Sequence, residues 1–243
     1  CRHVPRDGVV ECSTVFENPT DRPAVLEMLS SFAVRGLTAH RLHRALSFWS
    51  AEGRLLSQDL VDLDMEKSWS GGGLRTEKFG QTGSMPVRKW FPFLALENTE
   101  TGKFFAVQLY CASSWQLEVF RMQDPLCVCG GLADRDFGHW FKEIAPGESF
   151  ETPKAVIAEG DSLEEVCDKL VKAQHPRIAE IDRDMPVIFN EFCTTWGNPT
   201  LENLRKTAEK LEGSGVRYLV IDAGWYKKNA DWSGDVGDWV PNA

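Results

Sequence analysis

Residues 1 to about 160 consist of short runs in which apolar and polar positions alternate or apolar residues cluster, with turn residues between the runs. The runs at residues 9–16 and 91–96 are rich in Val, Phe or Leu, which favour strands. Asn18-Pro19 and Pro146-Gly147 are typical turn dipeptides. Many short strands at such spacing are typical of a β-sandwich. We therefore predict an all-β sandwich domain over residues 1–160.

The hydrophobic period changes at Asp161. Ser162 stands three residues before Glu165, which is the pattern of a capping box at the start of a helix. The apolar residues that follow repeat at helical spacing, and His175-Pro176 ends the pattern. The residues expected on one helical face are Leu163, Val166, Cys167, Leu170 and Val171. We predict a helix and then a linker over residues 161–184.

A third pattern fills residues 185–243. Residues 186–192 and 216–221 are apolar over most of their length, and residues 201–211 between them have helical spacing. Strand, crossover helix and strand in this order predict a right-handed parallel unit. The unit is too short for a complete barrel or doubly wound sheet, so we expect most of this domain to be missing. Asp222 ends the second strand, where functional residues of parallel barrels lie.

The bulk composition excludes several classes of protein. The chain has 243 residues and a formal net charge of −9 without a cluster of Lys and Arg, which argues against a nucleic-acid binder. No apolar run approaches the roughly 20 residues that span a bilayer, so we expect no membrane partner. No charged-then-apolar leader is present, and the chain opens at Cys1 rather than Met. We expect a piece of a longer protein.

The cysteines and histidines point away from metal sites. The seven cysteines include no Cys-x2-Cys pair, so we expect neither a disulfide framework nor a structural zinc site. Free thiols without a leader favour a reducing compartment, and we expect a cytoplasmic protein. His40 and His43 are the nearest histidines and are interpreted as surface residues. Gly-rich phosphate loops and a Gly-x-Ser-x-Gly elbow are also absent from the sequence, so we expect no cofactor.

Tryptophan is abundant, with nine residues, and several stand beside Gly, Ser, Asp or Asn as in loops. Exposed aromatic rings near acids suit sugars, whose apolar faces stack on the rings while their hydroxyls bind carboxylates. Core packing remains the alternative for each of these residues. The tryptophans in such a context are Trp69, Trp115, Trp196, Trp225, Trp232 and Trp239.

Five stretches can be compared with a known family. Residues 189–196 read FNEFCTTW, residues 220–226 read VIDAGWY, and Gly237-Asp238-Trp239 follows. Upstream, residues 146–153 read PGESFETP and residues 92–96 read PFLAL. In this order the stretches resemble glycoside hydrolase family 36, the α-galactosidase and α-N-acetylgalactosaminidase family. The first three resemble strand ends and loops of its barrel, and the last two resemble its β-sandwich.

The resemblance implies a β-sandwich followed by the start of a parallel (β/α)8 barrel, with residues 185–243 as the first unit of that truncated barrel. It implies a retaining exo-glycosidase that removes terminal α-linked galactose-type sugars from oligosaccharides or glycans. The two catalytic carboxylates would lie on later barrel strands, beyond Ala243. We therefore expect this N-terminal fragment to lack hydrolytic activity by itself.

The resemblance also implies part of a sugar pocket. Asp222 would bind hydroxyls of the terminal sugar, and Phe192, Trp196 and Trp225 would form aromatic walls. Loop capping remains the alternative for Asp222, as packing does for the aromatic residues. Where the family usually has a second Asp, this chain has Ala223, whose methyl group cannot accept a hydrogen bond. The terminal sugar therefore stays open among galactose, N-acetylgalactosamine and galactosamine.

Some members of the family are tetramers in which a tryptophan from one subunit's sandwich lines the pocket of another. Residues 47–52 look most like that region, so Trp49 is the first candidate for this role and Trp69 the second. Burial in the chain's own sandwich is the alternative for both. The resemblance thus implies a homo-oligomer, a tetramer or a dimer.

The alternative function is that of a non-catalytic carbohydrate-binding β-sandwich. Such a protein would bind sugars with exposed aromatic residues such as Trp69 and Trp115. It would leave the strand–helix–strand unit in residues 185–243 without a role, whereas the glycosidase interpretation uses both parts of the chain.

Overall fold

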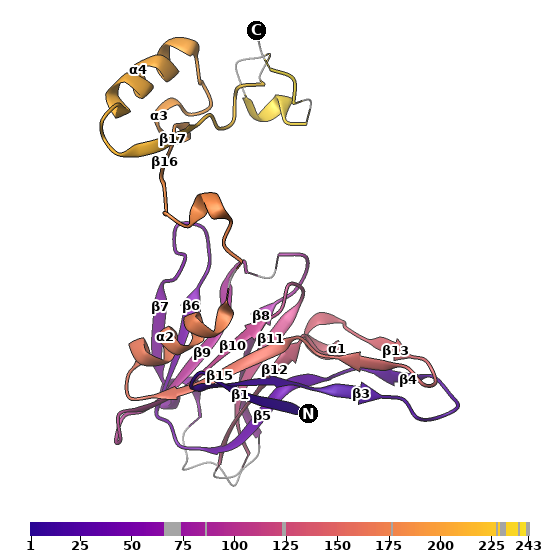
Figure 1. Ribbon diagram of the computed structural model, residues 1–243. Coiled ribbons are helices and arrows are strands. Elements are labelled where there is room, and N and C mark those ends of the chain that lie inside the picture. Colours follow the sequence, from indigo (N-terminus) through magenta and orange to yellow (C-terminus); the bar gives the residue numbers. More distant parts are fainter. Residues whose placement is uncertain are drawn as a thin grey trace. The chain divides into compact units, whose positions relative to one another are not determined.

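The computed structural model describes residues 1–65, 74–85, 87–122, 125–175, 177–226, 228, 232–237 and 239–241 of the chain. The chain divides into two compact units, Cys1–His175 and Pro176–Ala243 (Figure 1). This division falls inside the segment 161–184 that was expected to hold a helix and a linker. The domain limits predicted from the sequence stay predictions.

The first unit is mostly strands, as the alternating pattern predicted, and most of the strands in its described residues form two large antiparallel sheets (Figure 1). The seven-stranded sheet has the order β1 (Arg2–Arg6), β2 (Val9–Ser13), β15 (Lys154–Gly160), β10 (Lys103–Tyr110), β9 (Trp90–Asn98), β6 (Arg41–Leu46) and β7 (Leu55–Asp59). The four-stranded sheet has the order β5 (Ser30–Leu37), β12 (Leu126–Leu132), β11 (Trp115–Met122) and β8 (Leu74–Gln81). Inward side chains of both sheets, such as Leu94 and Leu117, share one hydrophobic core.

Two short ribbons accompany the sandwich. One pairs β3 (Val15–Glu17) with β14 (Ser149–Glu151), and the other pairs β4 (Ala24–Leu26) with β13 (Lys142–Ile144). The buried Asn18 side chain donates from Nδ2 to the carbonyls of Arg22, at 2.8 Å, and Ile144, at 2.9 Å. These bonds hold the chain at the junction of the two ribbons. The short helices η1 (Leu60–Leu63) and α1 (Arg135–Gly138) complete this part.

Trp115 is fully buried, so its expected role as an exposed, sugar-binding residue is wrong. The serines before it resemble a loop, but β11 begins at Trp115 itself. Side chains alternate along a strand, so Trp115 points into the core with Leu117 and Val119. Its ring and the Phe79 ring are nearly perpendicular, with their centroids 6.2 Å apart.

The predicted helix is confirmed as α2 (Leu163–Gln174), which covers the outer face of the seven-stranded sheet. Its buried side chains are Val166, Leu170 and Ala173. The Ser162 hydroxyl accepts from the Glu165 N–H at 3.1 Å, and the Glu165 carboxylate accepts from the Asp161 N–H at 2.8 Å. Val171, expected on the buried face, is 61% exposed instead.

The second unit contains the predicted strand, helix and strand. β16 (Val187–Asn190) pairs in parallel with β17 (Val216–Val220), and α4 (Leu201–Leu211) connects them. Thr200 caps α4 by accepting from the Asn203 N–H at 3.2 Å. The described residues of this unit also form the short helices η3 (Glu180–Asp182), α3 (Phe192–Thr195) and η4 (Trp232–Asp235). None of the helices in the described residues is long and apolar enough to cross a membrane.

β16 ends earlier than the apolar run predicted. Glu191 and Phe192 were expected in the strand, but Phe192 begins the single turn of α3. The side-chain oxygen of Asn190 accepts from the Phe192 N–H at 3.0 Å, an interaction that competes with a continued strand ladder. The chain therefore turns directly after Asn190.

Candidate functional site

The carboxyl ends of β16 and β17 bring Asn190 and Asp222 together. Parallel strands end at the same edge of a sheet, so residues that follow them meet there. Asn190 Nδ2 donates to Asp222 Oδ2 at 2.6 Å, and the Ala223 N–H donates to Asp222 Oδ1, also at 2.6 Å. The bond from Asn190 and then that from Ala223 lower the pKa of Asp222. Asp222 is therefore an ionised, partly exposed acceptor that can take further hydrogen bonds.

Glu191, which sequence reasoning missed, has no exposed surface. Its Oε1 accepts from the Asp222 N–H at 3.0 Å, and its Oε2 accepts from the Thr195 hydroxyl. Its own N–H donates to the Val220 carbonyl at 3.3 Å. Glu191 thus connects both strand ends. Its position directly after β16 resembles that of Asp222 near the end of β17, but nothing in the neighbouring sequence indicates that its side chain is buried.

The aromatic candidates fall into two groups. The Phe192 ring lies 5.8 Å from Trp196 and 5.6 Å from Trp232. The Trp225 ring lies 5.2 Å from Tyr226, a residue that is 3% exposed. Trp225 also contacts Trp239, at 6.2 Å. The structure therefore brings Phe192 and Trp196 together and places Trp225 in a separate group; Asp238 of the Gly-Asp-Trp stretch lies outside the described residues.

Two glycines let the loops after β16 and β17 touch. Gly197 and Gly224 have positive φ angles of 77° and 104°. A Cβ added to Gly224 would lie 2.2 Å from the Gly197 carbonyl oxygen, and one added to Gly197 would lie 2.1 Å from the Trp232 ring. Backbone contact between these loops holds the polar strand ends and the Phe192 ring group in one place. The arrangement can bind a polyhydroxylated ring through carboxylate, amide and aromatic groups.

Trp49, the candidate from the sandwich, is 85% exposed on the connection between β6 and β7, and its neighbour Phe48 is 60% exposed. The alternative that Trp49 packs into its own sandwich is therefore wrong. Trp69, the second candidate, lies outside the described residues.

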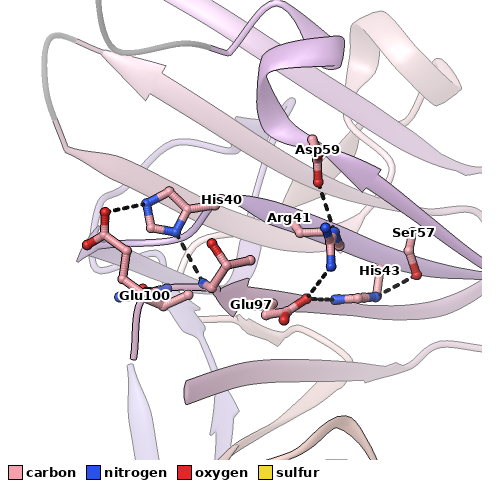
Figure 2. A network of polar contacts seen from close by, with 9 residues as sticks. His40, Arg41, His43, Ser57, Asp59, Glu97 and Glu100 are labelled. Atoms are coloured by element: carbon pink, nitrogen blue, oxygen red, sulfur yellow. Dashed lines mark hydrogen bonds and ion pairs between the residues drawn. The ribbon is translucent and has the colours of Figure 1, made fainter. Parts of the chain in front are cut away.

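A second polar cluster joins β7, β6 and β9 (Figure 2). Arg41 Nε donates to Asp59 Oδ1 at 2.8 Å, and its Nη1 donates to Glu97 Oε2 at 3.3 Å. His43 Nε2 lies 3.0 Å from the same Glu97 oxygen, and Nδ1 lies 2.8 Å from the Ser57 hydroxyl. His43 is only 5% exposed, so the interpretation of His43 as a surface residue is wrong.

The chemistry of Glu97 decides the tautomer of His43. A carboxylate only accepts hydrogen bonds, so His43 Nε2 carries the hydrogen and Nδ1 accepts from Ser57. Burial lowers the pKa of His43, although the contact with Glu97 partly opposes this shift.

Arg41 and Asp59 also border a hollow of about 850 Å³ at the sandwich. The polar groups of the cluster satisfy one another, which fits a role in fixing the edge strand β7.

The family model described as Melibiase matches residues 149–243. The α-galactosidase Mel36A of Lactobacillus acidophilus is 27% identical over 241 residues, which cover 90% of this chain and 31% of that protein. The α-galactosidase AgaA of Geobacillus stearothermophilus is 29% identical over 106 residues, 41% of this chain and 14% of that protein.

Solved structures show the same fold. The GH36 α-galactosidase AgaB of Geobacillus stearothermophilus superposes with a TM-score of 0.75 at 22% identity, covering 97% of this chain and 32% of that one. A variant of AgaA in complex with stachyose gives a TM-score of 0.76 at 21% identity, with the same coverage of 97% and 32%. The chain therefore spans about a third of the length of these relatives.

Proposed function

The chain belongs to glycoside hydrolase family 36, and we propose that it forms the sandwich and the first strand–helix–strand unit of a barrel in a longer, retaining exo-glycosidase. That enzyme removes terminal α-linked galactose-type sugars from oligosaccharides or glycans. The observation that carries the proposal is the Asn190–Asp222 pair at the ends of two parallel strands, inside the segment that matches the Melibiase model. A relative solved with stachyose supports an oligosaccharide as the substrate class.

In the proposed pocket Asp222 recognises the terminal sugar. Each of its oxygens already accepts one hydrogen bond from the protein, and each retains a lone pair for a sugar hydroxyl. The second N–H of the Asn190 amide can donate to the oxygen of a hydroxyl that Asp222 accepts. A carboxylate beside an amide therefore offers both an acceptor and a donor, and an epimer with a displaced hydroxyl would leave one of them unmatched.

Phe192, Trp196 and Trp225 are proposed as the aromatic walls. Trp196 supports this role best because 71% of its surface is exposed, so its ring face is free for stacking. Phe192 is held beside it by the bond between its N–H and Asn190. Trp225 follows Asp222 closely in sequence and would approach the sugar from the other loop.

The catalytic carboxylates of a retaining glycosidase act as a pair about 5–5.5 Å apart. We place both on strands that follow Ala243, so the 243-residue chain alone should bind sugar weakly and hydrolyse none. Ala223 cannot accept a hydrogen bond from a sugar hydroxyl, so galactose, N-acetylgalactosamine and galactosamine are the terminal sugars to test.

The exposed Trp49 fits a contact with another subunit, and we propose a dimer or tetramer in which this tryptophan lines the partner's pocket. Its exposure of 85% is unusual for a tryptophan and supports an intermolecular role.

The free cysteines favour the cytoplasm as the compartment.

The alternative, a non-catalytic carbohydrate-binding sandwich, loses support because Trp115 is buried and cannot stack on a sugar. Trp69, the other residue named for it, is not among the described residues.

The full-length protein should be assayed with a panel of aryl α-glycosides that differ only in the terminal sugar. We expect turnover of one galactose-type glycoside, and we expect Asp222→Ala to raise KM at least tenfold. Asp184→Asn is the matched control, because Asp184 is an exposed acid of the same unit that pairs with Arg217 at 3.8 Å. The absence of turnover on every glycoside would contradict the proposal, and unchanged kinetics of Asp222→Ala would remove Asp222 from the pocket.

A further inference from the structure

Glu191 is a buried acid without a cationic partner among the described residues. Burial of a carboxylate is costly unless strong donors or a cation compensate it. Asp134, a buried acid of the sandwich with 7% exposure, lies 3.0 Å from Lys78 Nζ. Glu191 has 0% exposure, and no Lys or Arg among the described residues forms an ion pair with it. The Asp222 N–H and the Thr195 hydroxyl are its donors. A residue held at this cost has a specific structural task.

That task is visible in the ladder between β16 and β17. The Glu191 N–H donates to the Val220 carbonyl at 3.3 Å, and in the part of the chain that the structure describes this bond ends the backbone ladder between the strands. Further along β17, the next N–H that faces β16 belongs to Asp222. The chain after β16 has already turned into α3 at Phe192, so no backbone carbonyl of a described residue stands opposite this N–H. The Glu191 side chain replaces the missing backbone acceptor, with Oε1 at 3.0 Å from the Asp222 nitrogen. The backbone of Asp222 is thereby fixed at the rim of the sheet.

We propose that Glu191 is a positioning residue that acts through Asp222, an inference that rests on the proposed function. Holding the Asp222 N–H orients the Asp222 carboxylate toward Asn190 and leaves its free lone pairs toward the sugar. Without this bond the segment after β17 can rotate, and the Asp222 carboxylate no longer meets the sugar hydroxyls at a fixed place. Glu191 itself does not touch the sugar, because its side chain is fully buried.

Three substitutions of Glu191 in the full-length enzyme test separately whether its length, its charge or the presence of its side chain is needed. Glu191→Gln keeps an oxygen that can accept from the Asp222 N–H, while its amide can donate to the Thr195 hydroxyl. Glu191→Asp keeps the charge but is one methylene too short to reach the Asp222 N–H. Glu191→Ala removes both bonds. We expect KM for the aryl α-glycoside to stay within threefold for Glu191→Gln and to rise about tenfold for Glu191→Asp and Glu191→Ala.

A double-mutant cycle tests whether the effect passes through Asp222. Once Asp222→Ala has removed the carboxylate, Glu191→Asp should change KM no further. The inference is overturned if Asp222→Ala raises KM but Glu191→Asp leaves KM unchanged and lowers only kcat or the melting temperature. It is also overturned if the two KM effects multiply, or if Glu191→Gln behaves like Glu191→Asp. Failure of the proposed function looks different, because then the unsubstituted enzyme has no turnover or Asp222→Ala has no effect, and this inference falls with it.

Discussion

At Gly224 the two loops of the candidate site are in close backbone contact. Its φ of 104° and the 2.2 Å approach of the Gly197 carbonyl oxygen to an added Cβ act together against any side chain. Gly215 has a similar φ of 88° but no heavy atom within 4 Å. We predict that Gly215→Ala lowers the unfolding free energy by about 1–2 kcal/mol through the left-handed backbone alone. Gly224→Ala should cost more, about 3 kcal/mol or above, because backbone atoms must also move.

Calorimetric melting of the full-length protein with each substitution measures this difference. The KM for the aryl α-glycoside should rise only for Gly224→Ala, since Gly215 lies at the far end of β17 from Asp222. Equal losses of stability for the two variants would show that the loops are not in close contact.

His43 makes the stability of the sandwich depend on pH. Burial lowers its pKa below the ordinary value of about 6.5, so the unfolded chain binds the proton more tightly than the folded one. The contribution of His43 to the unfolding free energy is therefore complete above about pH 6.5 and is lost as the pH falls below that value. The groups that face the ring are Glu97, Arg41, Ser57 and Phe104.

Urea midpoints measured at pH 7.5 and pH 5.5 test this prediction on the 243-residue chain. We expect the unfolding free energy to fall less between pH 7.5 and pH 5.5 in His43→Gln than in the unsubstituted chain, even though the variant is less stable at pH 7.5. The exposed His3 gives the matched control as His3→Gln. A pH dependence that His43→Gln leaves unaltered would contradict the assignment of a neutral, buried imidazole.

At the scale of elements, the β6–β7 hairpin and the core of the sandwich each contain a tryptophan, and the two differ in exposure. Trp49, at the hairpin tip, is 85% exposed, and Trp115, in β11, is 0% exposed. We predict that Trp49→Ala changes the unfolding free energy of the sandwich by less than about 0.5 kcal/mol. Trp115→Ala should cost about 3–5 kcal/mol, because it leaves a large cavity between the sheets. Urea unfolding of the 243-residue chain measures both, and a loss above about 1 kcal/mol for Trp49→Ala would show that the hairpin tip packs against its own sandwich.

The elements that the sequence predicted well are those specified by local chemistry. Ser162 and Thr200 cap α2 and α4 with hydrogen bonds to N–H groups three residues ahead, so both helix starts could be read from a few residues. Asp222 could likewise be placed at a strand end by the length of the apolar run. Trp115 could not be placed, because its burial depends on the register of β11 against β8 and β12.

Glu191 was beyond sequence reasoning for a related reason. Its partner, the Asp222 N–H, is 31 residues away, and an acid at the end of an apolar run is usually solvated. His43 was misjudged in the same way, since Glu97 lies 54 residues further along. Local sequence patterns thus predicted the helices, the strands and the edge of the sheet where Asp222 lies. The burial of a single polar residue could be known only once the order and pairing of the strands were known.

At the scale of the whole molecule, the two units differ in how well they cover their apolar surfaces. In the sandwich, α2 and the second sheet bury both faces of the seven-stranded sheet. In the second unit Val187, Ile188 and Ile221 are 58%, 56% and 48% exposed. Parallel sheets occur almost only with both faces covered, so a sheet of β16 and β17 alone is not a stable end state. The exposed residues are the surface that further strands and helices of the proposed barrel would bury.

Hydrogen exchange measures this difference directly. In the 243-residue chain we predict that amides of β10 and β11 exchange only through global unfolding, while those of β16 and β17 exchange orders of magnitude faster through local opening. In the full-length protein the amides of β16 and β17 should become as protected as those of β10, since added strands would supply partners for both edges. Slow exchange of β17 in the 243-residue chain would mean that the second unit is stable by itself, which would contradict the inference that it is the opening of a larger barrel.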